Sequence, residues 1–244
     1  MSASERRAAA RTAVVWEGLQ EVLGSGSDVL DIGGGTGGFA VRAAELGHRV
    51  TVVDPSPDAL AALDRRAHES GVADRVTGTQ GDAADLLEVV PEDSADVVLC
   101  HGVLEVVDDP AAALDAIARV LRPDGTLSLL VAQRHAAVVA RAMAGHFGQA
   151  RALLEDDVSR AAPASPAGRV GRRFTLDEVT ALLAGSGFTP RSVHAVRVFA
   201  DLVPGSLVDL EPGAAQALVD LEHAVAERPE YLPLATQAHV LARR

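Results

Sequence analysis

The chain has 244 residues, of which 48% are hydrophobic and only 3% are aromatic, so its core must be built from Ala, Val and Leu. Its net charge of −12 argues against the broad, sequence-blind binding of nucleic acids, which depends on phosphate neutralisation. No apolar run approaches the ~20 residues of a membrane span, and the N-terminus lacks the apolar core of a signal peptide. The single cysteine, Cys100, favours a reducing compartment, so we expect a cytoplasmic protein.

Apolar runs alternate with helical patterns along the first 132 residues. An amphipathic helix is expected over residues 3–23, and strands and helices then follow in turn. Near-continuous apolar strands separated by helices predict a parallel sheet that is covered on both faces. The strands are expected at 29–32, 49–53, 75–79, 95–100 and 126–132, and the helices at 36–46, 57–70 and 110–121.

The alternation breaks after residue 132. Residues 135–173 are expected to begin with a helix and to continue in turn formers and arginines, which indicates an insertion. Because ligands lie beyond the carboxyl ends of parallel strands, an insertion at this point is suited to act as a lid. Regular elements resume with a helix at 174–184 that Thr175 caps, strands at 188–199 and 235–241, and a helix at 213–227.

Five glycines fall within residues 33–38, directly after the strand at 29–32. The pattern G-x-G-x-x-G between a strand and a helix is typical of a loop whose backbone lies against a ligand. The same pattern is also compatible with a tight turn that binds no ligand. Asp54 ends the next strand, where a carboxylate can accept hydrogen bonds from a ribose diol. These features suit a dinucleotide as well as other adenosine-containing ligands.

Three further features favour a cationic nucleoside over a dinucleotide. Asp31 precedes the glycines by two residues, where it would face a pyrophosphate but suits a cationic ligand. Asp82, in Q-G-D-A after the third strand, can bind an adenine amino group. The turn L-R-P-D-G at 121–125 leads into the fifth strand.

The ordered set D-I-G-G-G-T-G-G, V-V-D-P-S, Q-G-D-A, A-D-V-V-L-C-H and L-R-P-D-G-T-L resembles the class I S-adenosylmethionine-dependent methyltransferases over about residues 28–132. The resemblance implies that S-adenosylmethionine is the cofactor and S-adenosylhomocysteine the product. It leaves an NAD dehydrogenase and a noncatalytic binding module as weaker alternatives. The implied cofactor-binding residues are Asp31, Gly33, Gly34 and Gly35 beside the nucleoside, Asp54 and Pro55 at the ribose, and Asp82 and Ala83 near the adenine.

We therefore predict an α/β fold, with a Rossmann-like, seven-stranded, mostly parallel sheet and helices on both faces. The family's sheet ends in an antiparallel strand, which would be the one at 235–241. We expect a single domain over residues 1–244, with an N-terminal helix (1–25), a cofactor-binding core (28–132), a lid insertion after strand five (135–173) and a C-terminal part of the sheet (174–244).

A second set of motifs, which extends beyond that core, resembles the bacterial tRNA methyltransferases that esterify 5-carboxymethoxyuridine at the wobble position. They include C-H-G-V-L-E-V-V-D-D-P, V-R-V-F-A-D, Q-A-H-V-L-A-R and the frame R-x-A-V-x-W in the first helix. The resemblance implies that Arg11 reaches the cofactor carboxylate and that His101 lines the cofactor pocket. It also implies that Arg197 and Asp201 are substrate-side groups.

Methyl transfer requires positioning and exclusion of water rather than a nucleophilic side chain, so we interpret Cys100 as core packing. His101 and Arg197 are the predicted catalytic residues. A carboxylate acceptor is ionised at pH 7 and needs a cation such as Arg197, whereas a hydroxyl or amine acceptor needs a base, for which His101 is the best candidate.

The acceptor stays open between tRNA and a small molecule, and no metal or membrane partner is indicated. An enclosed apolar pocket would favour a metabolite. A contiguous basic patch would favour tRNA, and it would consist of Arg160, Arg169, Arg172, Arg173 and Arg197.

Overall fold

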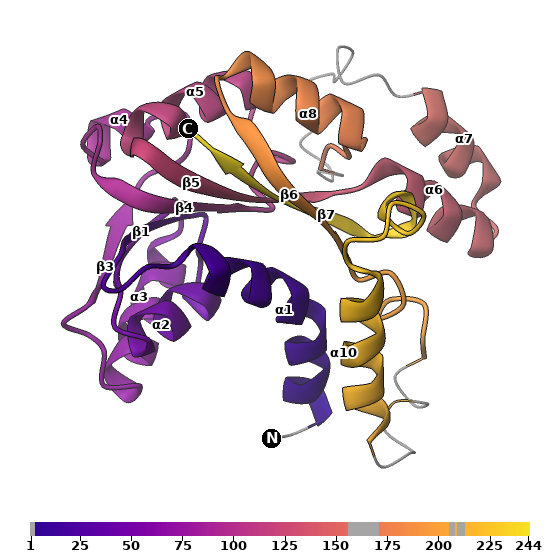
Figure 1. Ribbon diagram of the computed structural model, residues 1–244, viewed down its shortest axis with the longest axis horizontal. Helices are drawn as coiled ribbons and strands as arrows, with labels where there is room; N and C mark the ends of the chain where they lie inside the picture. The colour runs from indigo at the N-terminus through magenta and orange to yellow at the C-terminus, as the bar shows by residue number, and fades with distance from the viewer. Residues whose placement is uncertain (1–2, 156–170, 205–207, 209–212) are drawn as a thin grey trace. The chain divides into compact units, whose positions relative to one another are not determined.

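The computed structural model describes residues 3–155, 171–204, 208 and 213–244. Within them, seven strands form one sheet in the order β3-β2-β1-β4-β5-β7-β6 (Figure 1). Every predicted strand is present, and the largest difference is at β5, which begins five residues earlier than expected. The strands are β1 (Asp28–Ile32), β2 (Arg49–Asp54), β3 (Val76–Gln80), β4 (Ala95–His101), β5 (Leu121–Ala132), β6 (Thr189–Val196) and β7 (Gln237–Arg243).

Most strand pairs are parallel, namely β1 with β2 and β4, β2 with β3, and β4 with β5. The last strand runs the other way. The Gln133 N–H donates to the Thr236 carbonyl and the Arg244 N–H donates to the Gly125 carbonyl, so residue numbers rise along β5 as they fall along β7. The sheet is therefore mixed, and the predicted antiparallel final strand is confirmed.

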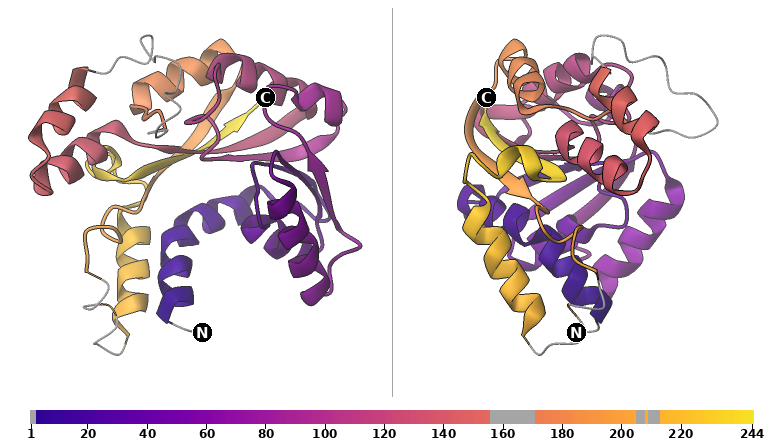
Figure 2. Two further views of the ribbon diagram at one scale, coloured as in Figure 1. Left: turned by 180° about the vertical axis from the view of Figure 1, so that it is seen from behind. Right: turned by 90° about the vertical axis from the view of Figure 1, so that its right-hand side faces the viewer.

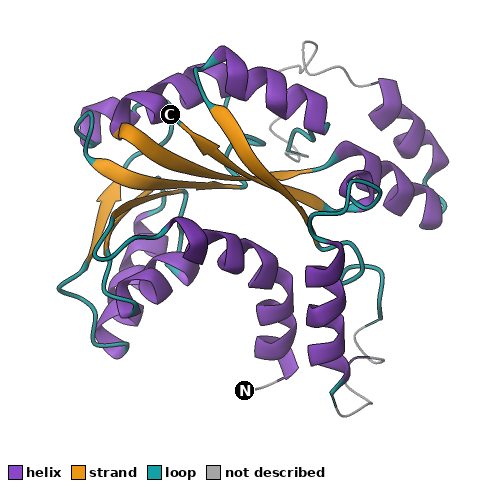
Figure 3. Cartoon of the chain, in the orientation of Figure 1, coloured by secondary structure: helices purple, strands orange, loops and turns teal. Residues whose placement is uncertain are grey.

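Helices separate the strands, as Figure 3 shows by colour, and several begin at caps that the sequence supplies. The Thr175 hydroxyl accepts from the Glu178 N–H at 3.3 Å, and the Glu178 carboxylate accepts from the Thr175 N–H at 2.7 Å, which is a capping box. The helices are α1 (Ala3–Val22), α2 (Gly38–Glu45), α3 (Pro57–Glu69), α4 (Leu86–Val89), α5 (Pro110–Val120), α6 (Arg134–Met143), α7 (Phe147–Glu155), α8 (Leu176–Gly185) and α10 (Ala214–Val225), with a 3₁₀ turn η2 (Leu232–Leu234).

Two helical expectations are corrected. The helix after the glycines begins at Gly38 rather than at 36, because Gly37 has a φ of 79° and cannot continue a right-handed helix backwards. The insertion begins with two helices, α6 and α7, because Gly145 between them has a φ of 77°. Residues 156–170, where the remaining turn formers of the expected lid fall, lie outside the described residues.

Contacts divide the chain into two compact units. The glycine-loop unit comprises residues 21–130, 180–191 and 241–244, and the insertion unit comprises residues 1–20, 131–179 and 192–240. The strands β5, β6 and β7 contribute residues to both units. The single domain over residues 1–244 stays a prediction.

In the glycine-loop unit, α2 and α3 pack on one face of β2 and β3, and α4 and α5 lie on the opposite face (Figures 1 and 2). The core is aliphatic, as the composition predicts, and includes the fully buried Leu30, Val52, Leu99 and Leu114. Burial of such side chains contributes about 1.5–3 kcal/mol each. Among the helices of the described residues, none is long and apolar enough to cross a membrane.

In the insertion unit, α1 and α10 lie side by side (Figures 1 and 2), and the Glu17 carboxylate contacts the His223 ring at 2.8 Å. Gly18 allows α1 to approach two stacked, buried imidazoles. A Cβ at this position would lie 3.1 Å from the His239 ring and 3.2 Å from the His194 ring. The helix therefore packs on the sheet through its bare backbone at this point.

Candidate functional site

The loop after β1 is shaped by glycines that other residues could not replace. Gly33 and Gly35 have φ values of 67° and 55°, in the left-handed region. The Gly33 N–H donates to the Val53 carbonyl at 2.7 Å, which ties the loop to the end of β2. A Cβ on Gly34 would lie 2.4 Å from the Asp31 carboxylate. The glycine backbone therefore lies directly against the carboxylates of Asp31 and Asp54.

Asp54 links this loop to the next one. Its carboxylate is 7% exposed and accepts from the Gly35 N–H at 2.9 Å through one oxygen and from the Ser56 N–H at 2.9 Å through the other. Because an ionised carboxylate has about four acceptor positions, each oxygen keeps capacity for a further donor. The vicinal hydroxyls of a ribose fit this pair of oxygens, and Pro55 follows as an exposed residue.

Asp31 is the most unusual acid of the site. It is 3% exposed, and burial together with the nearby charge of Asp54 raises the pKa of Asp31 to about 7. A cationic ligand beside it would favour the ionised form, whereas a pyrophosphate would add further negative charge. The arrangement therefore fits the sulfonium and ammonium groups of S-adenosylmethionine, in agreement with the sequence-based argument.

The segment after β3 carries the two residues predicted to lie near an adenine. Asp82 is exposed, and one of its carboxylate oxygens accepts from the N–H groups of Ala84 at 2.8 Å and Asp85 at 3.3 Å. The side chain thus shapes its own turn, which the sequence argument did not anticipate. Ala83 is 3% exposed and offers a small apolar surface.

His101 ends β4 in the same unit. Its Nε2 lies 2.8 Å from the Ser128 hydroxyl of β5, and its ring meets the Phe39 ring edge-on with 4.8 Å between the centroids. Burial lowers the pKa of His101 to about 4, so the imidazole is neutral at pH 7. The neighbouring Cys100 is fully buried and burial raises the pKa of its thiol, as core packing requires.

Arg11 and Arg197, which the sequence assigned to different ligands, meet on one carboxylate in the insertion unit. Asp201 contacts the Arg197 guanidinium at 2.5 Å and the Arg11 guanidinium at 3.4 Å. Gln237 accepts from Arg197 at 3.2 Å. Arg197 also has a φ of 61°, which is rare for a residue with a long side chain.

A cavity of about 360 Å³ lies beside this cluster within the insertion unit. Most of its lining is aliphatic, and three charged side chains stand among the apolar ones. Arg160 and Arg169 of the expected basic patch lie outside the described residues, and Arg197 is not in the lining. The lining residues are Ala136, Ala137, Val139, Ala140, Arg141, Arg173, Val198, Phe199, Asp201, Leu202, Leu234 and Thr236.

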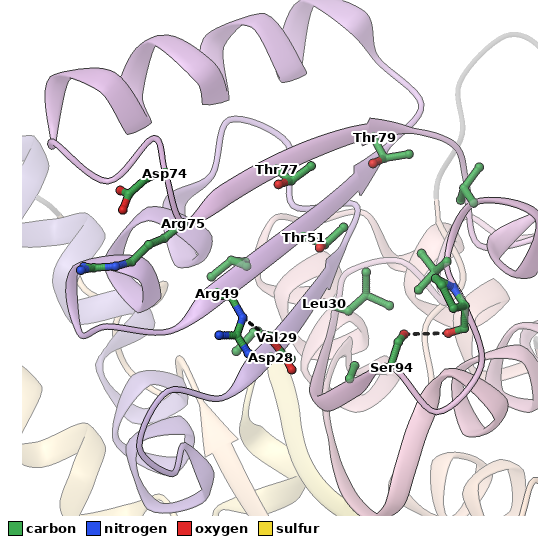
Figure 4. A pocket seen from close by; sticks show the side chains of 15 residues that line it. Asp28, Val29, Leu30, Arg49, Thr51, Asp74, Arg75, Thr77, Thr79 and Ser94 are labelled. Atoms are coloured by element: carbon green, nitrogen blue, oxygen red, sulfur yellow. Dashed lines mark hydrogen bonds and ion pairs between the residues drawn. The ribbon is translucent and has the colours of Figure 1, made fainter.

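Another cavity, of about 420 Å³, lies in the glycine-loop unit but contains none of the predicted cofactor residues. Figure 4 shows the threonines Thr51, Thr77 and Thr79 along β2 and β3, with the Arg49–Asp28 ion pair at one side. Thr51 and Thr77 are register partners on neighbouring strands. The sequence-based site and this hydroxyl-lined cavity are therefore separate features.

The structure thus places both Asp31 and Asp54 beside the glycine backbone, and separately joins Arg11 to Arg197 through Asp201. Sequence reasoning missed two residues that contact His101, namely Ser128 through its hydroxyl and Phe39 through its ring. The position of Phe39 directly after the glycine loop was a signal that could have found it. It also missed Glu222, which is buried on α10 and accepts from three N–H groups of the segment after Arg197.

Comparisons with known proteins support the same chemistry. Residues 30–129 match the family model described as a methyltransferase domain. The tRNA 5-carboxymethoxyuridine methyltransferase of Escherichia coli is 30% identical over 242 residues, which is 96% of this chain and 88% of that protein.

Two further proteins are similar in different ways. The ubiquinone biosynthesis O-methyltransferase of Xanthomonas euvesicatoria is 36% identical over 129 residues, or 53% of each protein. The structure is similar to that of an S-adenosylmethionine-dependent methyltransferase from Mesorhizobium loti, with a TM-score of 0.63 and 21% identity, over 96% of this chain and 100% of that one.

Proposed function

The chain belongs to the class I S-adenosylmethionine-dependent methyltransferases, and we propose that it esterifies a carboxylate on a modified wobble uridine of tRNA, in the cytoplasm. The observation that carries this proposal is the similarity to a tRNA 5-carboxymethoxyuridine methyltransferase over 96% of the chain, which extends through the insertion unit as well as the cofactor loop. Under this proposal the acceptor is already ionised at pH 7 and needs no base.

S-adenosylmethionine supplies an activated methyl group when it is bound. The residues of the glycine-loop unit bind and orient it, with Asp54 accepting from the ribose hydroxyls and Asp31 facing the cationic methionine moiety. Asp82 and Ala83 border the adenine. We assign Arg11 to the carboxylate of the methionine moiety, since a guanidinium binds a carboxylate through paired hydrogen bonds.

Arg197 is proposed to hold the acceptor carboxylate. Its pairing with Asp201 and Gln237 supports this role, because those partners orient the guanidinium before the acceptor arrives. His101 is neutral at pH 7 and borders the cofactor in this scheme. For an acceptor with a hydroxyl or amine it would serve as the general base.

The test is mass spectrometry of tRNA nucleosides from a strain that lacks this protein. We expect the unesterified carboxymethoxyuridine to accumulate and the ester to disappear. Purified protein should then methylate that tRNA, with activity that falls steeply with salt because RNA binding releases counterions. Unchanged tRNA nucleosides in the deletion strain would overturn the tRNA proposal.

A small-molecule acceptor is the second candidate, and the aliphatic cavity in the insertion unit favours it. A volume of about 360 Å³ suits a metabolite-sized ligand, and Arg141 and Arg173 could hold an anionic end of it. If this candidate is correct, a metabolite rather than a tRNA nucleoside changes in the deletion strain, and activity responds weakly to salt.

A further inference from the structure

The segment after β6 adopts an unusual conformation at the residue proposed to hold the acceptor. Arg197 has a φ of 61°, and among the described residues only Asp93 and Asp124 share a positive φ without being glycine. Such conformations cost of order 1 kcal/mol or more and persist only where the surroundings impose them. The neighbours of this segment must therefore hold it in place.

Glu222 of α10 provides that restraint. One of its carboxylate oxygens accepts from the Phe199 N–H at 2.8 Å and the Ala200 N–H at 2.7 Å. The other oxygen accepts from the Val198 N–H at 2.9 Å. Three successive backbone donors thus converge on one side chain that comes from more than 20 residues further along the chain.

Because Glu222 is buried, its carboxylate depends on these three hydrogen bonds. The residue is only 1% exposed. A buried carboxylate without partners is costly, and so are three backbone N–H groups without acceptors, so each side satisfies the other. Removal of the charge would weaken all three hydrogen bonds at once, because they end on the same carboxylate.

What this segment presents is the proposed acceptor side of the protein. Arg197 immediately precedes the three amides, and Asp201 immediately follows them. Val198, Phe199 and Asp201 also line the cavity of about 360 Å³, whereas Glu222 is not part of that lining. Glu222 therefore fixes residues at the acceptor side without being exposed to a ligand in the cavity.

We propose that Glu222 is a positioning residue for the acceptor, acting through the backbone of residues 198–200 on the orientation of Arg197. This inference rests on the proposed role of Arg197 in methyl transfer. It applies to a tRNA acceptor and to a small-molecule acceptor, because both would meet the same segment.

The experiment compares Glu222→Gln with Asp220→Asn, a matched carboxylate-to-amide change at an exposed position of the same helix. In Glu222→Gln, the new NH₂ group faces a backbone donor, so hydrogen exchange of residues 198–200 should rise at least tenfold. The KM for tRNA that contains 5-carboxymethoxyuridine should rise about tenfold, with S-adenosylhomocysteine affinity within twofold of the wild type. Asp220→Asn should match the wild type in all three measurements.

Glu222→Asp keeps the charge on a shorter side chain and should fall between the wild type and Glu222→Gln. A double variant with Arg197→Ala tests the route of the effect. If Glu222 acts through Arg197, the Glu222→Gln substitution should have much less effect on KM in the Arg197→Ala background.

The inference is overturned if exchange at residues 198–200 stays unchanged, or if it rises while the acceptor KM does not. It is equally overturned if both Glu222→Gln and Glu222→Asp raise hydrogen exchange throughout the insertion unit. That outcome would mean that Glu222 stabilises the whole unit rather than positions residues 198–200. Wild-type protein that fails to methylate the tRNA refutes the proposed tRNA acceptor instead. In that case, the orientation of Arg197 is tested by the rate at which phenylglyoxal modifies its guanidinium, measured by peptide mass spectrometry. This rate should be higher in Glu222→Gln than in the wild type. An unchanged rate overturns the inference.

Discussion

The glycine-loop unit and the insertion unit hold their charged groups in different ways. In the former, Asp54 bonds to backbone N–H groups of two adjacent loops, and Asp31 is enclosed beside them. In the latter, Arg197 pairs with Asp201 four residues further along the same segment, and Arg11 of α1 reaches the same carboxylate from a distant part of the sequence. A site that depends on backbone leaves one short contiguous motif, whereas a site that joins α1 to the segment after β6 through side chains leaves its residues in two distant parts of the sequence. This explains why the cofactor can be identified from the sequence while the acceptor cannot.

The largest effect should follow from a side chain added to the backbone-built site. In Gly34→Ala the new Cβ would lie 2.4 Å from the Asp31 carboxylate, so that acid must move. We expect S-adenosylhomocysteine affinity to fall roughly 100-fold, or about 3 kcal/mol, in calorimetric titration. Gly148→Ala in α7 is the matched control, because its added Cβ would meet nothing within 4 Å beyond the neighbouring backbone of its own helix. Unchanged affinity in Gly34→Ala would contradict the assignment of this loop.

Asp31→Asn should separate stability from binding. The folded-state pKa of Asp31 is raised from 3.8 to about 7, so its stabilising contribution is fully present below pH 3.8 and is lost as the pH rises through 7. Asn does not titrate, so at pH 8 the variant should be more stable than the wild type, by about 1–3 kcal/mol. Denaturant unfolding at pH 5 and pH 8 measures the difference, which should shrink at the lower pH.

The same variant should bind S-adenosylhomocysteine about tenfold more weakly, since it lacks the charge that is proposed to face the ammonium group. Stability that is equal to the wild type at both pH values would contradict the raised pKa. Unchanged affinity would instead contradict the contact with the cofactor.

The arginine pair tests the side-chain-built site. Arg197→Ala should lower kcat/KM for the acceptor about tenfold and leave S-adenosylhomocysteine affinity unchanged, whereas Arg11→Ala should weaken that affinity about tenfold. Steady-state kinetics and calorimetry on both variants measure the split. If the two variants behave alike, the shared contact with Asp201 governs both residues and their separate assignments are wrong.

The smallest effect is expected at Cys100. Its thiol is fully buried and stays protonated because burial raises its pKa. Cys100→Ala should therefore keep kcat within about twofold and lower the unfolding free energy by about 1 kcal/mol. A loss of activity larger than the loss of stability would assign the thiol a chemical role.

Strands such as β2 and β4 could be predicted because they are largely apolar, and the glycine loop because its residues are contiguous. The start of β5 could not, since L-R-P-D-G is typical of a turn. The strand instead runs through it with Asp124 at a φ of 65° and a register shift opposite Ala95 and Val97. The four-residue α4 is too short for any helical periodicity.

The supporting residues of the site were harder to find. Ser128 stands alone in an apolar segment, whereas Glu222 lies close to other polar residues of α10, and the partners of both lie 22 to 27 positions away. For Glu222 a signal did exist, because it occupies helical spacing with the buried Val225 and Ala226. A charged residue on the apolar face of a helix requires a buried partner.

The position of β7 between β5 and β6 has a consequence for how the protein is made. The ribosome completes β6 before the strand that joins it to the rest of the sheet exists. At an elongation rate of about 5–20 residues per second, roughly 10 s pass between the completion of β5 and that of β7. Throughout that interval the backbone of β5 is an open edge, which is the kind of surface that chaperones cover and that other nascent chains can pair with.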